Sequence, residues 1–240
     1  MKILITNDDG IESEGIHVLA RFARELGDVT VCAPKVNQSA KSHSINIHSP
    51  FEIKQVDFMP GVTAYAVDST PADCVRFALL RLKEKYDIVL SGINNGLNIG
   101  LDMLYSGTVS AIFEAYAERT RAIAVSCEPN DFAVAEKELS RIYDFFISNE
   151  LLSHCPLYNV NIPKNASDIR ITHQGGRYYN DSFTYLGNDM YEQHGYSVHE
   201  DKKDFTIDTD AALNGHISVT PITIDRTDRA AFEKLLNTAK

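Results

Sequence analysis

Short apolar runs alternate with amphipathic segments through the first two thirds of the chain, and this alternation limits the fold more than any other feature. The first run, Lys2–Thr6, is rich in β-branched apolar residues, which predicts a strand buried on both faces of a parallel sheet. After it, Val18, Leu19, Phe22 and Leu26 recur at helical spacing. Strands that alternate with helices favour a right-handed, doubly wound, mostly parallel sheet, a Rossmann-like α/β fold.

The same alternation continues along the chain. Further sheet strands are expected at residues 29–33, 87–90, 122–126, 157–162 and 217–220, and helices at residues 71–85, 109–119, 132–149 and 229–239. Residues 45–53 and 62–67 are interpreted as a hairpin lying off the main sheet. Residues 91–100 are so rich in Gly and Asn that we expect a loop there.

The C-terminal third differs in character. Residues 169–206 are rich in Tyr, Asn, Asp and Gly without a helical period, which predicts extended arms or hairpins. The sequence has no internal repeat, low-complexity tract or clear linker. We therefore expect a single domain over residues 1–240, with a core sheet in residues 1–165. Residues 166–240 would form a β-rich C-terminal arm, strand and helix for oligomerisation.

Charge and cysteine usage narrow the function. A net charge of -10 argues against binding to duplex nucleic acid, which relies on a basic surface. Cys32, Cys74 and Cys127 lie in apolar strand or helix contexts without a CxxC pair, which is typical of reduced thiols in a cytoplasmic protein. Because the chain opens on a core strand, we expect no signal peptide. No apolar run approaches the length of a membrane span, so no membrane partner is expected.

Asp8 and Asp9 follow the first strand directly. In open α/β sheets the carboxyl edge of the strands binds ligands. Two adjacent carboxylates repel each other unless a cation lies between them, so a hard divalent metal would fit there. The alternative is that both residues simply form a turn beside Gly10.

Three polar loops follow strands and can converge on one crevice of a doubly wound sheet. Their candidate ligands all present oxygen, which suits Mg²⁺, Mn²⁺ or Ca²⁺; they are Asp8, Asp9, Asn37, Ser39, Asn94, Asn95 and Asn98. Turn formation would explain any single Asn equally well. Three Asn and three Gly within residues 91–100 favour a site.

Ser106, Gly107 and Thr108 precede a predicted helix. The free N–H groups and positive dipole end of such a helix can bind an anion, and glycine allows close approach. Simple capping by Ser or Thr is the alternative. Asp208 and Asp210 have the spacing of a DxD metal-nucleotide motif, but acidic residues in a first helical turn explain them as well. His43 is either a phosphate donor or a solvated loop residue.

Several motifs resemble, in order and spacing, those of the SurE family, the survival protein E 5'/3'-nucleotidases. They cover essentially the whole chain: Asn7-Asp-Asp-Gly10, Ala33-Pro34 with Asn37 and Ser39, Thr70-Pro-Ala-Asp-Cys-Val75, Ser91-Gly-Ile-Asn94, Asn98-x-Gly100, Tyr105-Ser-Gly-Thr-Val109, Ala122-Ile-Ala-Val-Ser126 and Ile217-Ser-Val-Thr-Pro221.

The resemblance implies a SurE-like fold and a phosphatase with one divalent cation, Mg²⁺ or Mn²⁺. The substrates it implies are nucleoside 5'- and 3'-monophosphates, other phosphomonoesters and short polyphosphate. It implies metal ligands at Asp8, Asp9, Ser39 and Asn94, of which Asp8 and Asp9 are also catalytic. It implies substrate phosphate contacts from Asn37, Asn98, Ser106, Gly107 and Thr108, and a homodimer or homotetramer built by exchanged arms.

The sequence departs from the usual family pattern near the predicted site. Lys35 stands where Asp is common and Ala40 where Gly is usual. Further departures lie at Ser69, Ala115, Arg121 and Ile207. None removes a proposed ligand, so we expect an active enzyme in which Lys35 and Ala40 affect substrate preference or metal affinity.

The favoured hypothesis is hydrolysis by a metal-activated water, with Asp9 as a candidate base or orienter of that water. A phosphatase that forms an aspartyl phosphate needs two Asp residues two positions apart. Asn7 occupies the position two before Asp9, so the spacing argues against this mechanism. A nucleotide-binding sensor without turnover is the alternative from another class. For the tyrosine-rich arm, a flexible lid over its own active site is the alternative to exchange.

Overall fold

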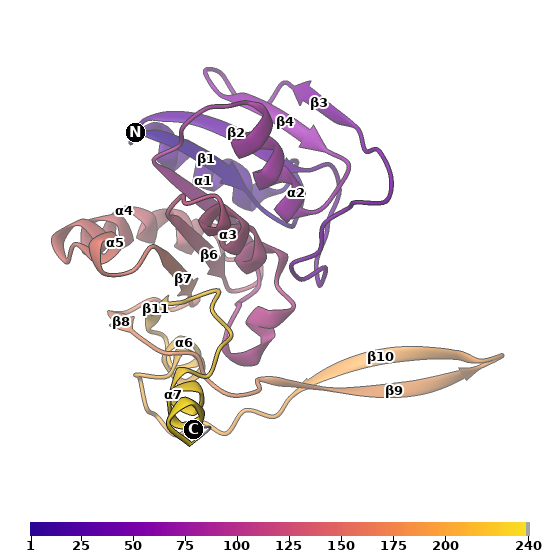
Figure 1. Cartoon of the computed structure of the whole chain (residues 1–240), viewed down its shortest axis with the longest axis vertical. Helices are drawn as coiled ribbons and strands as arrows, with labels where there is room; N and C mark the ends of the chain where they lie inside the picture. Colours follow the sequence, from indigo (N-terminus) through magenta and orange to yellow (C-terminus); the bar gives the residue numbers. More distant parts are fainter. Residues whose placement is uncertain (239–240) are drawn as a thin grey trace.

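The protein, described over residues 1–238 by a computed structural model, is centred on one large sheet (Figure 1). Within these residues the sheet has nine strands in the order β3-β4-β2-β1-β5-β6-β7-β11-β8. The bounds are β1 Lys2–Thr6, β2 Asp28–Pro34, β3 Ile53–Val56, β4 Thr63–Val67, β5 Ile88–Asn95, β6 Ala122–Cys127, β7 Leu157–Ile162, β8 Ile169–Ile171 and β11 Ile217–Pro221. Parallel pairing runs unbroken from β4 to β7, while β3 and β11 pair antiparallel with their neighbours β4 and β7. The predicted mostly parallel α/β sheet is confirmed.

Helices cover both faces of the sheet, because successive residues of each strand point to opposite faces. Ile3 and Ile5 pack with α1 (Glu14–Arg24) and α4 (Phe132–Ser148), which is followed by the short α5 (Leu151–His154). Leu4 packs on the other face with α2 (Pro71–Arg76) and α3 (Gly107–Ala117). The fold is therefore doubly wound, as the sequence predicts.

Two expected strands are placed differently. Residues 45–52 form no strand, because the Asn46 side chain accepts hydrogen bonds from the backbone N–H groups of His48 and Ser49 and closes a turn. The β3–β4 hairpin extends the main sheet, with β4 parallel to β2. The expectation of a strand over residues 45–53 and of a hairpin off the sheet is wrong.

Two other boundaries differ from the sequence prediction. The helix that begins at Pro71 continues as a π-helical turn, Phe77–Arg81, and stops before residue 85. Lys83, just after this turn, has a left-handed backbone that ends the helix. β5 runs on to Asn95 because Asn94 and Asn95 pair with Ser126 and Cys127 of β6 after a register shift. The loop expected over residues 91–100 therefore begins later than its composition suggests.

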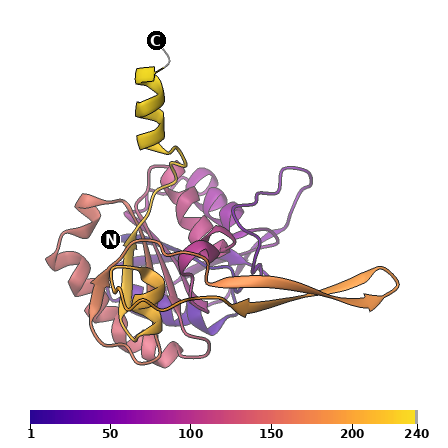
Figure 2. The same cartoon turned by 90° about the horizontal axis from the view of Figure 1, so that it is seen from below.

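The C-terminal third combines sheet strands with two projections. β8 and β11 lie beyond residue 165 yet belong to the main sheet, and α6 spans Asp208–Leu213. The antiparallel hairpin β9 (Tyr179–Gly187) and β10 (Met190–Ser197) projects away from the body in both views (Figures 1 and 2). In Figure 2, α7 (Arg229–Thr238) also projects, and no described residue of it is buried. The predicted end of this helix at Ala239 lies outside the described residues. Within residues 1–238, no helix is both long and apolar enough to span a membrane.

Candidate active site

Asp8 lies at the carboxyl end of β1 and touches the start of α3. Its side chain is 3% exposed, and its carboxylate accepts a hydrogen bond from the Thr108 hydroxyl. A Cβ on Gly107 would lie 2.7 Å from the Asp8 Cβ and 2.9 Å from its Oδ2. Only glycine therefore lets α3 approach Asp8 so closely.

Asp9 joins two other loops to the first. Its Oδ2 accepts a hydrogen bond from the Asn95 backbone N–H at 3.0 Å, and its Oδ1 accepts one from Asn37 Nδ2 at 3.4 Å. Asn37 Oδ1 in turn accepts the Ser39 N–H at 2.9 Å. The backbone N–H of Gln38 also donates to the Asp8 carbonyl, at 2.7 Å. The loops after β1, β2 and β5 thus converge, as predicted.

Both carboxyl groups lie in surroundings that disfavour their charged forms. Burial raises the pKa of Asp8, and the nearby charge of Asp9 raises it further, whereas hydrogen bonds from Thr108 act against that rise. Burial also raises the pKa of Asp9, against the hydrogen bond from Asn95. A cation beside the pair would favour the charged forms instead.

The donor set fits a hard divalent cation. Asn94 Nδ2 donates to the Gly96 carbonyl at 2.7 Å. Among the described residues, no hydrogen-bond donor reaches Asn94 Oδ1, and Ser39 is exposed. Two carboxylates, an amide oxygen and a hydroxyl form an all-oxygen set, which Mg²⁺ and Mn²⁺ prefer.

The start of α3 is capped by its own sequence. Ser106 Oγ accepts the Val109 N–H at 3.1 Å, so the capping interpretation is confirmed. Capping leaves the first N–H groups of the helix, at Gly107 and Thr108, without an intrahelical partner. An anion at this helix end stays a prediction, and the first helical turn already contacts Asp8.

Comparison with known proteins supplies the family. The profile described as "Survival protein SurE" matches residues 3–181. The chain belongs to the SurE family. A protein named 5'-nucleotidase SurE from Caldanaerobacter subterraneus subsp. tengcongensis is 41% identical over 97% of this chain and 95% of its own length. The 5'-nucleotidase SurE from Alkaliphilus metalliredigens is 39% identical over 99% and 98%.

The fold comparison agrees with the sequence. The crystal structure of the SurE protein from Aquifex aeolicus superposes with a TM-score of 0.80 at 30% identity, covering 100% of both chains. The SurE resemblance drawn from the motifs is therefore confirmed, and so is the α/β fold class.

In this SurE chain Asn98 contacts strands β6 and β7. It is buried, and its Nδ2 donates to Ser126 Oγ of β6 at 2.9 Å. Its backbone is held by Asn159 and Asn161 of β7. Asn159 and Asn161 are not among the residues predicted from the sequence, although two Asn in the apolar run Leu157–Ile162 are a visible signal.

The other singled-out residues lie away from Asp8. Asp208 lies in the first turn of α6, and its carboxylate accepts the N–H groups of Gly100 at 3.0 Å and Gly175 at 2.7 Å. This favours the helix-turn explanation over a DxD motif. His43 Nε2 lies 2.9 Å from Glu114 Oε2 of α3, and the His43 side chain is 30% exposed, so the ring is paired with a carboxylate and only partly solvated.

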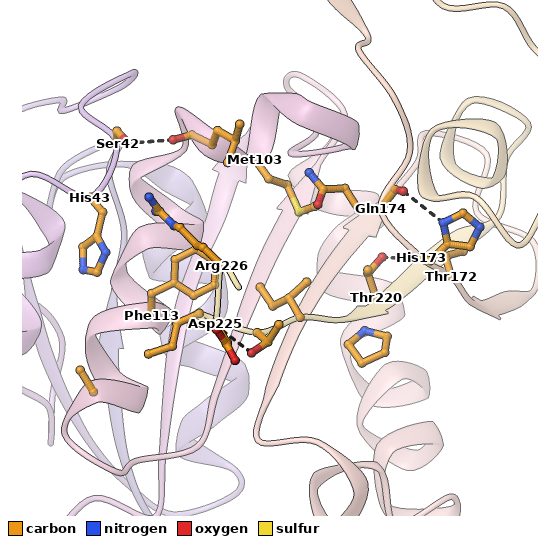
Figure 3. A pocket seen from close by; sticks show the side chains of 16 residues that line it. Ser42, His43, Met103, Phe113, Thr172, His173, Gln174, Thr220, Asp225 and Arg226 are labelled. Carbon is orange, nitrogen blue, oxygen red and sulfur yellow. Dashed lines mark hydrogen bonds between the residues drawn. The ribbon is translucent and has the colours of Figure 1, made fainter. Parts of the chain in front are cut away.

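Two further features of the chain lie outside the predicted site. The ligand atoms of His199, Asp201 and Asp210 lie within 4.8 Å of one another and could hold a metal ion. However, Asp210 Oδ2 already accepts the N–H groups of Lys202 and Asp204. A cavity of about 840 Å³ lies beside α3, and Figure 3 shows Phe113 and Arg226 facing it. Its lining includes His43 but none of the predicted metal ligands or phosphate contacts at Asp8, Asp9, Asn37, Ser39, Asn94, Asn98 and residues 106–108.

Proposed function

We propose that this SurE chain is a divalent-metal-dependent 5'-nucleotidase that hydrolyses the phosphomonoester bond of nucleoside 5'-monophosphates, and of 3'-monophosphates as well. The observation that carries the proposal is the convergence of three loops on Asp8 and Asp9 beside the start of α3. SurE relatives named 5'-nucleotidases support the reaction class. Other phosphomonoesters and short polyphosphate are further candidate substrates.

Asp8, Asp9, Ser39 and Asn94 would hold one Mg²⁺ or Mn²⁺ ion. When bound, the ion supplies a polarised phosphoryl group and an activated water. The hydrogen bond from the Thr108 hydroxyl and the close approach of Gly107 restrict the Asp8 side chain, which supports its assignment as a ligand. Asp9 is held by Asn37 and Asn95, and this position suits a base or orienter of the attacking water.

The substrate phosphate would bind between the ion and α3. Gly107 and Thr108, which follow the Ser106 cap, form the positive end of α3, where an anion is favoured. Asn37 and Asn98 would contribute amide groups from the other two loops. Burial around Asp8 strengthens these electrostatic contacts, since a lower local dielectric screens them less.

The assembly proposed is a homodimer or homotetramer in the cytoplasm, built by exchanged C-terminal arms. The hairpin exposes Tyr179, Phe183, Tyr185, Tyr191 and Tyr196 and projects away from the sheet (Figures 1 and 2). Aromatic residues on an extended arm gain most free energy by packing on another surface. A lid over its own site would instead lie across the carboxyl end of β1, beside Asp8 and Asp9.

Phosphate release from a panel of nucleoside 5'- and 3'-monophosphates tests the activity. Turnover is expected with Mn²⁺ or Mg²⁺ and should disappear with a chelator. Nucleotide binding without phosphate release under all metal conditions would contradict the proposal and support the sensor alternative.

The phosphate site has its own test in Gly107→Val. Inorganic phosphate should inhibit the wild type competitively, and the variant should raise KM or abolish activity because its side chain would collide with Asp8. Gly176→Val is the matched control, since a Cβ there meets nothing within 4 Å. Unchanged kinetics and phosphate inhibition in Gly107→Val would place the anion site elsewhere.

A further inference from the structure

β7 carries two amide side chains in a place where apolar residues would be expected. Asn159 and Asn161 are both 0% exposed within the otherwise apolar or aromatic strand Leu157–Ile162. Being two residues apart, they point to the same face of the sheet. Burying a polar side chain costs free energy unless it is hydrogen-bonded, so their contacts should explain their presence.

Both side chains bind the backbone of Asn98. Asn161 Oδ1 accepts the Asn98 N–H at 2.7 Å, and Asn161 Nδ2 donates to the Asn98 carbonyl at 3.1 Å. Asn159 Nδ2 donates to the same carbonyl at 2.7 Å. The two side chains therefore satisfy both backbone groups of one residue, as a neighbouring strand would.

The arrangement is not the cheapest way to fill this space. Asn159 Oδ1 is buried and has no hydrogen-bond partner among residues 1–238, which carries a desolvation cost. An apolar side chain of similar size would avoid that cost but would leave the Asn98 backbone unpaired. The amides are therefore matched to the conformation of residue 98 rather than to packing alone.

The held residue lies between two parts of the proposed site. Asn98 follows the end of β5, and after it the 3₁₀ helix Gly100–Leu104 leads to the Ser106 cap of α3. The far side of this segment is fixed independently, because Gly100 N–H donates to Asp208 and its carbonyl accepts from Gln174. Asn98 is thus the point where β7 can set the path of the chain from β5 to α3.

We propose that Asn161, assisted by Asn159, is a positioning residue for phosphate binding. By holding both backbone groups of Asn98, the pair fixes the Asn98 side chain and the approach to the α3 N-terminus, the two places proposed to contact the phosphate. This inference rests on the proposed function. Asn159 and Asn161 are assigned no contact with the substrate and act through the phosphate contacts. Their loss should therefore weaken phosphate binding more than it slows the chemical step.

Asn161→Asp is the most selective variant. It keeps the size and the oxygen that accepts the Asn98 N–H, but it presents a second oxygen to the Asn98 carbonyl in place of a donor. We expect KM and the inhibition constant of inorganic phosphate to rise roughly tenfold, since a lost buried hydrogen bond leaves its partner unsatisfied. The turnover number kcat should change less.

Two variants complete the series. Asn159→Asp removes one of two donors to the same carbonyl, so its effect should be in the same direction and smaller. Ser218→Ala is the matched control. Ser218 of β11 is the strand partner of Asn161 in β7, and its buried hydroxyl has no hydrogen-bond partner among the described residues. It should leave KM and phosphate inhibition unchanged.

Hydrogen exchange gives a readout that needs neither metal nor substrate. Exchange of the peptide covering residues 96–100 should accelerate in Asn161→Asp, less in Asn159→Asp and not in Ser218→Ala. Wild-type KM, phosphate inhibition and exchange in a folded Asn161→Asp would overturn the inference. If Asn161→Asp does not fold, unchanged values in Asn159→Asp overturn it. A wild type without chelator-sensitive turnover would instead refute the proposed function. Hydrogen exchange would still test whether Asn159 and Asn161 hold the backbone of Asn98.

Discussion

The carboxyl ends of the parallel strands and the β9–β10 hairpin differ in which side chains they bury. At the carboxyl ends of the parallel strands, polar groups such as Asp8, Thr108 and Asn98 are buried and hydrogen-bonded within the chain. On the hairpin, Phe183 is 66% exposed and Tyr191 62% exposed, and both are large and apolar or aromatic. The polar groups of the first region are hydrogen-bonded within the chain, whereas the aromatic side chains of the hairpin are left exposed.

This difference separates the proposed catalytic site from the proposed assembly surface. The geometry at Asp8 and Asp9 depends on contacts among β1, β2, β5 and α3, none of which involves the hairpin. A change in one region should therefore leave the other nearly untouched.

Asp8→Asn should lower kcat/KM roughly a thousandfold, because losing the charge weakens the hold on a hard cation and several kcal/mol of transition-state stabilisation with it. The fold should persist, as circular dichroism can check. Asp189→Asn makes the same chemical change in the hairpin turn and should leave the kinetics unaltered. Near wild-type, chelator-sensitive activity in Asp8→Asn would remove Asp8 from the metal site.

Deletion of residues 176–203 should convert a stable oligomer into monomers, because it removes the exposed aromatic surface of the arm. Light scattering at micromolar concentration measures the change, and kcat per chain should stay within a few-fold of the wild type if the two regions are independent. An intact protein that is already monomeric would rule out arm exchange. A large loss of activity on deletion would favour the lid.

The sequence predicted the sheet and the convergence of its loops because these follow from local patterns. The apolar run Lys2–Thr6 and its polar successor Asp8-Asp9 specify a strand and its carboxyl edge without knowledge of the rest of the chain. The motif resemblance then identified the family. Both inferences depend on spacing along the sequence, which is what periodicity and motifs measure.

What the sequence did not predict depends on contacts between distant residues. Asn161 meets Asn98 across 63 positions, and Asp208 meets Gly100 across 108. The sequence predicts a strand over residues 45–53, but the Asn46 turn and the Asp73 carboxylate, which accepts the Asn46 N–H, hold residues 45–52 in another conformation. Side-chain to backbone hydrogen bonds of this kind compete with strand formation.

Glu114→Gln should loosen the loop that carries Ser39 without touching the site. Glu114 accepts hydrogen bonds from His43 at 2.9 Å and from Arg76 at 2.7 Å, and an amide would turn a donor toward one of them. Stability should fall by about 1–3 kcal/mol, which thermal denaturation can measure. Glu136→Gln, at the exposed pair with Arg21, should cost less than about 0.5 kcal/mol.

The same pair has a defined pH dependence. The hydrogen bond from His43, followed by Arg76, lowers the pKa of Glu114 from its ordinary value of 4.5. A lowered pKa in the folded state stabilises the fold above pH 4.5, and this stabilisation is lost as pH falls through the folded pKa. The stability gap between wild type and Glu114→Gln should therefore shrink in acid. A gap that widens below pH 4.5 would contradict the assignment.

Ala40→Gly should produce the smallest effect, and it is a gain. Ala40 has a φ of 60° in the loop that carries Ser39, a left-handed backbone that costs an alanine roughly 1 kcal/mol and costs a glycine little. Its side chain is exposed, so little packing is lost on substitution. The motif resemblance places the usual family glycine at this position. The free energy of unfolding should rise by about 0.5–1 kcal/mol, which corresponds to a Tm about 1–4 °C higher.

The matched control for this gain has the opposite sign. Ala133→Gly makes the same change at an exposed position of α4 and should lower stability by about 0.5–1 kcal/mol, because glycine is a poor helix former. Both effects should leave the oligomeric state unchanged, since neither residue lies in the hairpin. Equal losses at positions 40 and 133 would show that Ala40 carries no left-handed strain. The Ser39 loop would then owe its shape to its hydrogen bonds, among them those of Asn37, Gln38 and Ser42.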